Sequence, residues 1–323
     1  MISALVYRDN RLSAQNPAVE TLAALRDEPG VMLWVDLTAP TDEETRQVLA
    51  GAFQFHPLAI EDCVSDAPFP KIEPYGDYVH LVMHAVDYTQ VDSFMTTGLD
   101  FFLGKNFLVT YHRQPLRATA TARERLLRTP GLAVRGPDRF AHTILDLMVE
   151  GYKPALDFLR GQIEEIAEHV LHHGSADELF PAMVAVRKQL ARLRQIVRPQ
   201  RAVVAELAQG KSKLIRKVIL PYLRDLEEDL GRIEAQAASW ADQLILTFRL
   251  FINKSSHEAN AGIRVMTAIT ALTIPALLIG GWLGMNFENM PEFGIPYGYP
   301  ITFALTLAST GAILLFMRRK KWL

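Results

Sequence analysis

The chain has 323 residues, enough for about two domains, and a formal net charge of −2, which excludes the strong basic field of most nucleic-acid-binding proteins. Its single cysteine, Cys63, excludes an intrachain disulfide and a zinc site built from cysteines, and is typical of a reducing compartment. The sequence has neither a glycine-rich phosphate loop of the Walker type nor an HExxH metal helix. We therefore expect no enzyme, no organic cofactor and no nucleic-acid partner.

The N-terminal region alternates short strand and helix signals. Segments rich in Val, Tyr and Phe predict strands at residues 2–8, 31–37, 78–88 and 99–113. Helix signals lie between them, at residues 19–28, 41–53 and 56–64, and Thr41 is the expected N-cap of the second helix. Proline and glycine at residues 129–138 end this pattern. The sequence predicts an α/β domain over residues 1–135.

The following region, residues 136–260, is predicted to be helical because apolar residues recur every three or four positions. The first two runs are Leu156, Leu159, Ile163, Ile166 and Val170, then Met183, Val186, Leu190, Leu193 and Val197. The third run is Leu223, Leu226, Leu230, Ile233, Ala237, Trp240 and Leu244. This spacing is typical of helices packed along their length.

The third run has no proline from Tyr222 until Pro275. A helix unbroken from Pro221 to Leu283 would be about 95 Å long. The remaining residues of one chain cannot cover so long a rod, so we expect it to pack against copies of itself.

Two apolar segments near the C-terminus predict membrane spans. Residues 265–287 are 23 residues without a charge, roughly 34 Å as a helix, and residues 293–317 form a second uncharged run. We expect transmembrane helices at residues 261–283 and 301–317, joined by a loop at 284–300 and followed by a basic tail at 318–323. The basic tail predicts that both termini are cytoplasmic and that the loop lies outside a plasma membrane or bacterial inner membrane.

Two helices per chain cannot enclose a polar path across a bilayer, since an open pore needs several helices around it. A channel would therefore need several subunits, each contributing one helix to the wall.

Gly284, Met285 and Asn286 form a GMN tripeptide at the outer end of the first predicted span, continued as NFENMPE and followed by GYP. These motifs together closely resemble those of the CorA-type magnesium channels. The resemblance extends over nearly the whole chain, through HPLAIEDC, LPYLRDL, NKSSHEAN, Pro275 and the closing KKWL. It implies an α+β fold, with a cytosolic α/β domain, a long-helix stalk and two transmembrane helices, assembled as a homopentameric funnel in the lipid bilayer.

The resemblance implies that Gly284, Met285 and Asn286 form a selectivity filter. Mg²⁺ loses its water reluctantly and prefers octahedral oxygen ligands, so a ring of neutral amide oxygens could hold it through its waters. Glu288 and Glu292 would raise the cation concentration at the outer mouth. The structural alternatives are a helix cap at Asn286, close helix packing at Gly284 and ordinary solvated acids.

One face of the first span is implied to line the pore. It is composed of Asn260, Ile263, Thr267, Thr270, Ile274 and Leu277, with Met266 beside it. Asn260 would form a polar ring at the cytosolic end, and Ile263 and Met266 a hydrophobic constriction that closes by dewetting. The alternative is that these side chains only contact lipid or neighbouring helices.

Asp62 and Asp225 match family positions at which cytosolic Mg²⁺ bridges neighbouring subunits. Two carboxylates repel across an interface unless a divalent ion lies between them, so Mg²⁺ would hold the channel closed and its depletion would loosen it. The alternative is an ordinary solvated acidic face. Three histidines, His169, His172 and His173, lie at a predicted helix end, where they suit the helix dipole but do not complete a zinc site.

The sequence thus predicts a passive divalent-cation channel, mainly for Mg²⁺ and also for Co²⁺ and Ni²⁺, whose partners are its own copies, lipid and metal ions. Mg²⁺ is both the transported and the regulatory ion in this interpretation. A zinc or broad divalent-metal transporter of the same superfamily, with or without proton coupling, is an alternative. A membrane-anchored metal sensor or scaffold that conducts no ion is another.

Overall fold

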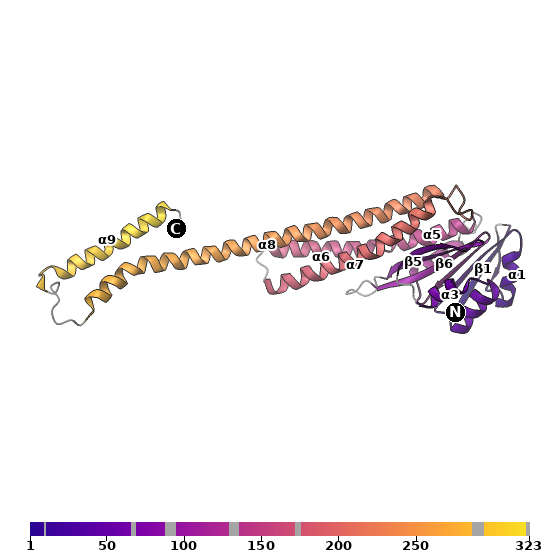
Figure 1. Cartoon of the computed structure of the whole chain (residues 1–323), viewed down its shortest axis with the longest axis horizontal. Coiled ribbons are helices and arrows are strands. Elements are labelled where there is room, and N and C mark those ends of the chain that lie inside the picture. The colour runs from indigo at the N-terminus through magenta and orange to yellow at the C-terminus, as the bar shows by residue number, and fades with distance from the viewer. Residues whose placement is uncertain are drawn as a thin grey trace. The chain divides into compact units, whose positions relative to one another are not determined.

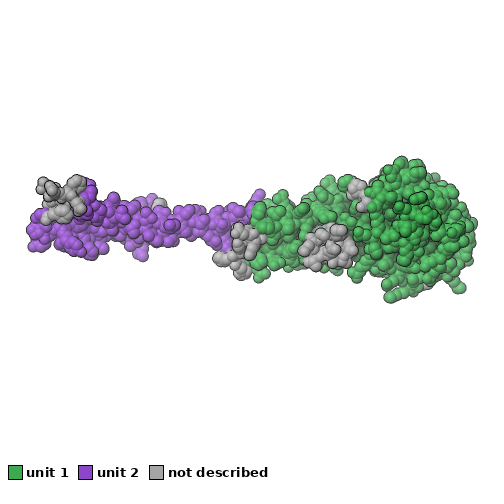
Figure 2. Space-filling model, turned by 90° about the horizontal axis from the view of Figure 1, so that it is seen from below, with its two compact units in different colours: residues 1–245 green, residues 246–323 purple. Residues whose placement is uncertain are grey.

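The structure is a computed structural model that describes residues 1–9, 11–65, 69–87, 95–128, 136–171, 176–285 and 294–320. The chain divides into two compact units, residues 1–245 and residues 246–323 (Figure 2). The α/β region and the helical bundle both belong to the first unit. The domain boundaries expected at residues 135 and 260 stay predictions.

The first unit contains a seven-stranded sheet with the order β2-β1-β3-β7-β6-β5-β4 (Figure 1). The strands are β1 (Ile2–Arg8), β2 (Arg11–Gln15), β3 (Val31–Thr38), β4 (Lys71–Pro74), β5 (Tyr78–Asp87), β6 (Met95–Gly104) and β7 (Phe107–His112). Only β3 and β7 pair in parallel; the other neighbours are antiparallel. The four predicted strand segments are confirmed, and the last of them forms the hairpin β6–β7.

Helices cover both faces of the sheet, which explains why β3 is buried along nearly its whole length. One face packs against η1 (Val19–Thr21), α1 (Leu22–Asp27), α2 (Asp42–Thr45), the π-helix η2 (Arg46–Ala52) and α3 (Pro57–Ser65). The other packs against α4 (Arg117–Arg128) and α5 (Pro137–Glu150), where Trp34 and Phe140 meet edge to face at 4.7 Å between ring centroids.

The predicted start of the second helix is confirmed at atomic detail. Thr41 caps α2 by accepting a hydrogen bond from the backbone N–H of Glu44, while the Glu44 carboxylate accepts one from the Thr41 backbone N–H. This reciprocal capping box satisfies two backbone donors that a helix start otherwise leaves unpaired.

Three helices, α6 (Lys153–Leu171), α7 (Ala176–Ala208) and α8 (Leu220–Leu283), carry the predicted apolar periodicity. In Figure 1, α6 and α7 run beside the first part of α8 within the first unit. Nearly all the predicted seam residues are buried; Leu156 and Trp240 are half-buried. The long helix is also confirmed, because α8 continues for 64 residues and passes Pro275 without a break.

Polar contacts hold the start of α8 against α5. The carboxylate of Asp138, with its side chain 2% exposed, accepts hydrogen bonds from the Arg216 guanidinium and from the Arg216 backbone N–H. One turn further, His142 Nε2 donates to the Tyr222 carbonyl at 3.1 Å, and Arg139 stacks on the Tyr222 ring. Burial lowers the pKa of His142 and so favours the neutral imidazole, while the hydrogen bond to the Tyr222 carbonyl acts in the opposite direction.

Replacing Asp138 with alanine is expected to destabilise the protein by about 2 kcal/mol. The substitution leaves the backbone N–H of Arg216 without its buried acceptor, while the half-exposed guanidinium can turn to water. Thermal unfolding of the purified protein measures the effect as a lower Tm. Glu124→Ala is the control, since Glu124 makes only a solvent-exposed pair with Arg128 at 3.8 Å. Equal Tm values for the two variants would show that the Asp138 contacts do not stabilise the α5–α8 junction.

The second unit contains residues 246–283 of α8 and α9 (Gly298–Arg319). Both helices have segments long and apolar enough to cross a membrane. Their large side chains are exposed, including Met266 and Leu277 at 73% and Tyr299 at 85%. An apolar surface of this extent is unfavourable in water and requires lipid or other protein chains around it.

Candidate functional site

The first two residues of the GMN motif directly follow α8, which ends at Leu283. The backbone N–H of Gly284 donates to the Gly280 carbonyl at 2.9 Å, and that of Met285 to the Trp282 carbonyl at 3.4 Å. A Cβ at position 284 would lie 3.0 Å from the Gly280 oxygen, so a larger residue there would displace this last turn. The motif therefore begins directly after the last residue of α8, and Asn286 follows outside the described residues.

The expected pore face is exposed in the single chain. Asn260, Thr267 and Thr270 are exposed, and the apolar members Ile263, Ile274 and Leu277 are 62%, 46% and 73% exposed. Steps of three and four residues along one continuous helix place these side chains on one stripe. Buried Ala268 and Pro275 fall between its members and not on it. The stripe is thus free to face another helix, lipid or an aqueous path.

The hydroxyl groups of the two threonines in this stripe donate hydrogen bonds to backbone carbonyls of α8. Thr267 Oγ1 donates to the Ile263 carbonyl at 2.8 Å, and Thr270 Oγ1 donates to the Met266 carbonyl at 2.9 Å. Each oxygen keeps lone pairs that can accept a further hydrogen bond. The Oγ1 atoms of these two threonines can therefore accept hydrogen bonds from the waters around a cation.

Asp62 lies on α3 and is paired within its own chain. Its carboxylate forms an ion pair with Lys71 Nζ, and the same ammonium donates to Glu73 Oε1 at 3.1 Å. Glu73 in turn accepts a hydrogen bond from the Tyr75 hydroxyl at 2.9 Å, and a ring nitrogen of His80 lies within 4.8 Å of the two carboxylates. The side chains of Asp62 and Lys71 are 28% and 29% exposed, so a cation from solvent can reach this cluster.

Asp225 differs from Asp62 in its surroundings. It lies exposed on the second turn of α8, and the described part of the chain offers it no ion pair or hydrogen bond. Within the described residues of one chain, Asp62 and Asp225 make no hydrogen bond or ion pair with each other. Asp225 is therefore a free carboxylate, whereas Asp62 is already partly neutralised by Lys71.

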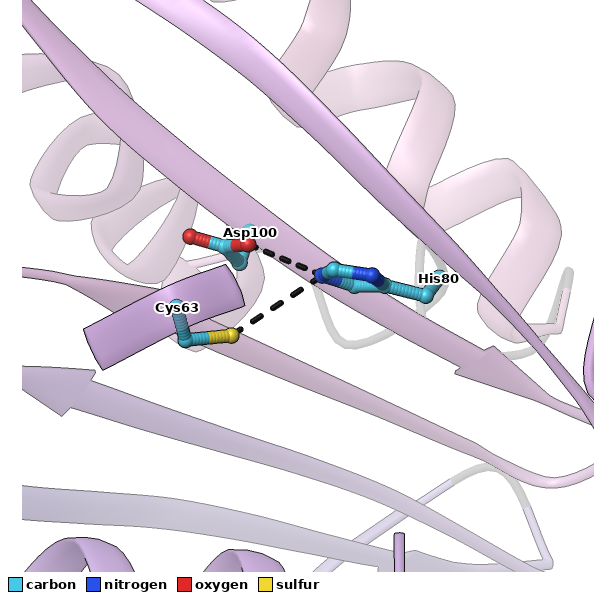
Figure 3. A group of neighbouring side chains, drawn as sticks. All are labelled: Cys63, His80 and Asp100. Atoms are coloured by element: carbon cyan, nitrogen blue, oxygen red, sulfur yellow. Dashed lines mark hydrogen bonds and ion pairs between the residues drawn. The ribbon is translucent and has the colours of Figure 1, made fainter. Parts of the chain in front are cut away.

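A second polar cluster lies deeper under α3, and nothing in the sequence pattern indicated it. Cys63, His80 and Asp100 come from α3, β5 and β6 and are 2%, 0% and 6% exposed (Figure 3). His80 Nε2 lies 2.8 Å from Asp100 Oδ1 and 3.8 Å from Cys63 Sγ. Burial, followed by the nearby Asp100 carboxylate, raises the pKa of the Cys63 thiol well above its usual value.

Several residues singled out in the sequence lie outside the described residues, namely Asn286, Glu288, Glu292, His172 and His173. His169, the remaining member of the histidine group, is exposed on α6. The roles expected of these residues at the filter, at the outer mouth and at a helix end stay predictions.

Comparison with known proteins identifies the family of this chain. The family described as "CorA-like Mg2+ transporter protein" matches residues 29–319. YfjQ of Bacillus subtilis (strain 168) is 29% identical over 289 residues, which cover 90% of this chain and 89% of that protein. The cobalt/magnesium transport protein CorA of Thermotoga maritima is 25% identical over 307 residues, covering 94% of this chain and 87% of that protein.

The fold is also that of a solved member. The complete structure of the CorA magnesium transporter from Methanocaldococcus jannaschii matches 99% of this chain and 98% of its own, with a TM-score of 0.82 at 19% identity. The α/β domain, the long helix and the two apolar C-terminal helices are therefore features of a known fold. The chain belongs to the CorA-like Mg²⁺ transporter family, and it is a membrane protein that transports Mg²⁺ or other divalent metal ions.

Proposed function

We propose that this protein is a homopentameric channel that passes hydrated Mg²⁺, and also Co²⁺ and Ni²⁺, down their electrochemical gradients. The observation that carries the proposal is the exposed stripe of α8, which combines Asn260, Thr267 and Thr270 with apolar side chains and leads to the GMN motif. Lipid does not suit the polar side chains of the stripe, and water does not suit the apolar ones. An aqueous pore lined by copies of this helix accommodates both, because the polar side chains contact water and the apolar ones contact the neighbouring copies.

The number of helices supports an assembly. A single chain supplies two candidate spans, which cannot surround an aqueous path. If α8 from each subunit lines the pore, its opposite side and α9 can face neighbouring helices and lipid. The exposed apolar side chains of the second unit would then all have suitable surroundings.

Ile263 and Met266 form the gate in this proposal. They are 62% and 73% exposed and lie one turn of α8 apart. Repeated around a ring, apolar side chains of this size exclude water when the ring narrows, and an ion cannot pass a dry constriction. Asn260, about one turn before Ile263, supplies a polar ring at the cytosolic end.

Asn286 is the selecting side chain in this proposal. It directly follows Met285 in the sequence, and in this proposal five copies of it converge around one axis at the outer end of the first span. Amide oxygens carry no net charge, so they hold the waters of the ion strongly enough to select and weakly enough to release it. Glu288 and Glu292 attract cations to the outer mouth, an effect that salt screens.

The membrane potential supplies the driving force for uptake. With both termini in the cytosol, Arg318 and Arg319 end α9 on the side where basic residues are enriched. A potential of about 100 mV, negative inside, favours each inward-moving charge by about 2.3 kcal/mol, and thus a divalent ion by about 4.6 kcal/mol. No nucleotide site is needed for such transport.

Cytosolic Mg²⁺ closes the channel by binding between Asp62 of one subunit and Asp225 of the next. Asp225 is a free, exposed carboxylate that can provide oxygen ligands directly. Asp62 can do so only when its pairing with Lys71 is weakened. The ion and the ammonium therefore compete for one carboxylate, which sets the Mg²⁺ concentration at which closure occurs.

Replacing Lys71 with methionine is expected to lower the Mg²⁺ concentration that half-inhibits transport by about 3- to 10-fold. Removing the ammonium frees Asp62 and Glu73, and a partly exposed pair of this kind contributes about 0.7–1.4 kcal/mol. Ion flux measured at a series of internal Mg²⁺ concentrations gives the value. Lys105→Met is the matched control, because Lys105 is exposed in the β6–β7 turn. An unchanged inhibitory concentration in Lys71→Met would contradict the competition.

Flux into liposomes tests the proposed transport itself. Purified protein is reconstituted, and uptake of Mg²⁺, Co²⁺, Ni²⁺ and Zn²⁺ is measured with and without a pH gradient. We expect Mg²⁺ uptake that follows the membrane potential and is indifferent to the pH gradient. Zn²⁺ uptake that needs the gradient would instead establish the zinc-transporting alternative, and no flux at any internal Mg²⁺ would establish a non-conducting sensor.

A further inference from the structure

The buried cluster of Cys63, His80 and Asp100 brings together a sulfur, a nitrogen and an oxygen donor (Figure 3). Their ligand atoms all lie within 4.8 Å of one another. In Figure 3 the Cys63 thiol and the Asp100 carboxylate both face the same ring nitrogen of His80. Bonds of about 2.0–2.3 Å to a four-coordinate ion place neighbouring ligands roughly 3.3–3.8 Å apart. The 3.8 Å between Cys63 Sγ and His80 Nε2 fits this spacing, and the Asp100 carboxylate, 2.8 Å from the same nitrogen, has to move slightly away as the ion enters.

The sheet register explains why these residues meet. His80 pairs with Phe102 and Val82 pairs with Asp100, so His80 and Asp100 are diagonal neighbours on one face of adjacent antiparallel strands. The His80 ring also stacks on Phe102, with 4.7 Å between ring centroids, which fixes its orientation. Helix α3 covers this face and places Cys63 over it.

We propose that Cys63, His80 and Asp100 bind a divalent transition-metal ion, of the class of Zn²⁺ or Co²⁺, inside the α/β domain. Thiolate and imidazole suit Zn²⁺ and Co²⁺, whereas Mg²⁺ prefers oxygen ligands alone. A thiolate and a carboxylate also balance the double charge of the ion, which a buried site requires. As the ion binds, the Cys63 thiol gives up its proton to the surrounding buffer.

The remaining nitrogen of His80 determines the expected strength of binding. Nδ1 is buried and has no hydrogen-bond partner in the described part of the chain. A metal-bound imidazole usually donates its other N–H to an acceptor, and loss of that contact weakens binding by about 10- to 100-fold. We therefore expect binding about 10- to 100-fold weaker than at a site whose histidine has such an acceptor, so that the site fills and empties as the ion concentration changes.

The site would bind transition-metal ions and not Mg²⁺, and it lies directly under α3. Cys63 directly follows Asp62 on α3, so the proposed ion lies under the same helix that carries the carboxylate for which Mg²⁺ and Lys71 compete. The metal site itself does not depend on the proposed Mg²⁺ regulation, because its three donors belong to one chain and differ from Asp62 and Asp225.

Cobalt absorption spectroscopy of the metal-free, purified full chain tests the site. A thiolate bound to Co²⁺ gives a near-ultraviolet charge-transfer band, and Cys63 is the chain's single cysteine, so the band can come from no other residue. We expect one Co²⁺ per subunit with this band, persistence of the band in a large excess of Mg²⁺, and its loss when Zn²⁺ is added. Oxygen-only sites elsewhere in the protein give no such band.

Three variants assign the ligands. Cys63→Ser should lose the band, and His80→Ala and Asp100→Asn should keep the thiol but weaken Co²⁺ binding at least about 10-fold. His169→Ala is the control, because His169 is exposed on α6. Absence of the band in the unaltered protein at saturating Co²⁺ overturns the proposal whatever the variants do. A band of unchanged affinity in His80→Ala overturns the ligand assignment.

Discussion

The Asn286→Ala variant is expected to take up no Mg²⁺ in liposomes while it still assembles at the size of the unaltered protein. The substitution removes the amide oxygen from every subunit at once, so the filter loses its whole ring of acceptors for the waters of the ion. Hydrated Mg²⁺ exchanges its ligands reluctantly, and an apolar ring at this position offers no replacement. Ion flux measures the loss, and size-exclusion chromatography measures assembly.

Asn289→Ala is the matched control for this experiment. It makes the same chemical change three residues further along the same loop, outside the GMN motif. We expect the control to retain most of the flux. Normal uptake by Asn286→Ala would remove the filter assignment, and loss of the assembled state would show that Asn286 acts in packing.

The double variant Asp62→Asn with Asp225→Asn is expected to conduct at internal Mg²⁺ concentrations that close the unaltered protein. Both carboxylates that could hold the bridging ion become neutral amides, so cytosolic Mg²⁺ loses its preference for the closed state. A ligand shifts an equilibrium only as far as its affinities for the two states differ. Flux measured across a series of internal Mg²⁺ concentrations should therefore show little or no inhibition.

Asp157→Asn with Asp242→Asn provides the control for charge. It removes the same number of carboxylates from exposed positions on α6 and α8. Inhibition should be unchanged in that control. If the Asp62 and Asp225 variant is inhibited as strongly as the unaltered protein, regulation through these residues is excluded. Its Tm separates a regulatory effect from unfolding, since Asp62→Asn also weakens the contact with Lys71.

Two variants, Lys71→Met and Cys63→Ser, distinguish the proposed binding of Mg²⁺ at Asp62 from the proposed binding of a transition metal at Cys63. Lys71→Met changes competition for Asp62 and should move only the Mg²⁺ dependence of flux. Cys63→Ser changes the buried cluster and should move only the cobalt spectrum. Helix α3 thus carries two neighbouring residues that would bind different ions, Asp62 near the surface and Cys63 in the core.

The sequence by itself determined the long helices and the predicted spans. Periodic positions such as Leu190, Leu226 and Leu230 are buried in α7 and α8, and α8 reaches Leu283 as the pattern indicated. Strands β1, β3 and β5 were also predicted, because their Val-, Tyr- and Phe-rich composition is a local signal. Periodicity and composition are local properties of the sequence, so they can be recognised without knowing which distant residues are in contact.

Other elements escaped prediction because their sequences carry little local signal. Strands β2 and β4, with the sequences RLSAQ and KIEP, are the two edges of the sheet and have few apolar residues. Helix α4 contains mostly charged residues and small ones such as alanine and threonine, and only its packing against α5 shows which of them are buried. Edge strands acquire their conformation from the neighbour they pair with, which the sequence does not reveal.

Only the tertiary structure decided which side chains share a site. Asp62 was predicted to share a bridging ion with Asp225, which stays a prediction, whereas its pairing with Lys71, nine positions along the chain on an edge strand, was not foreseen. Cys63, His80 and Asp100 meet because of one strand register and the helix laid over it. Register and layer packing depend on hydrogen bonds and burial summed over the whole domain, so no local pattern records them.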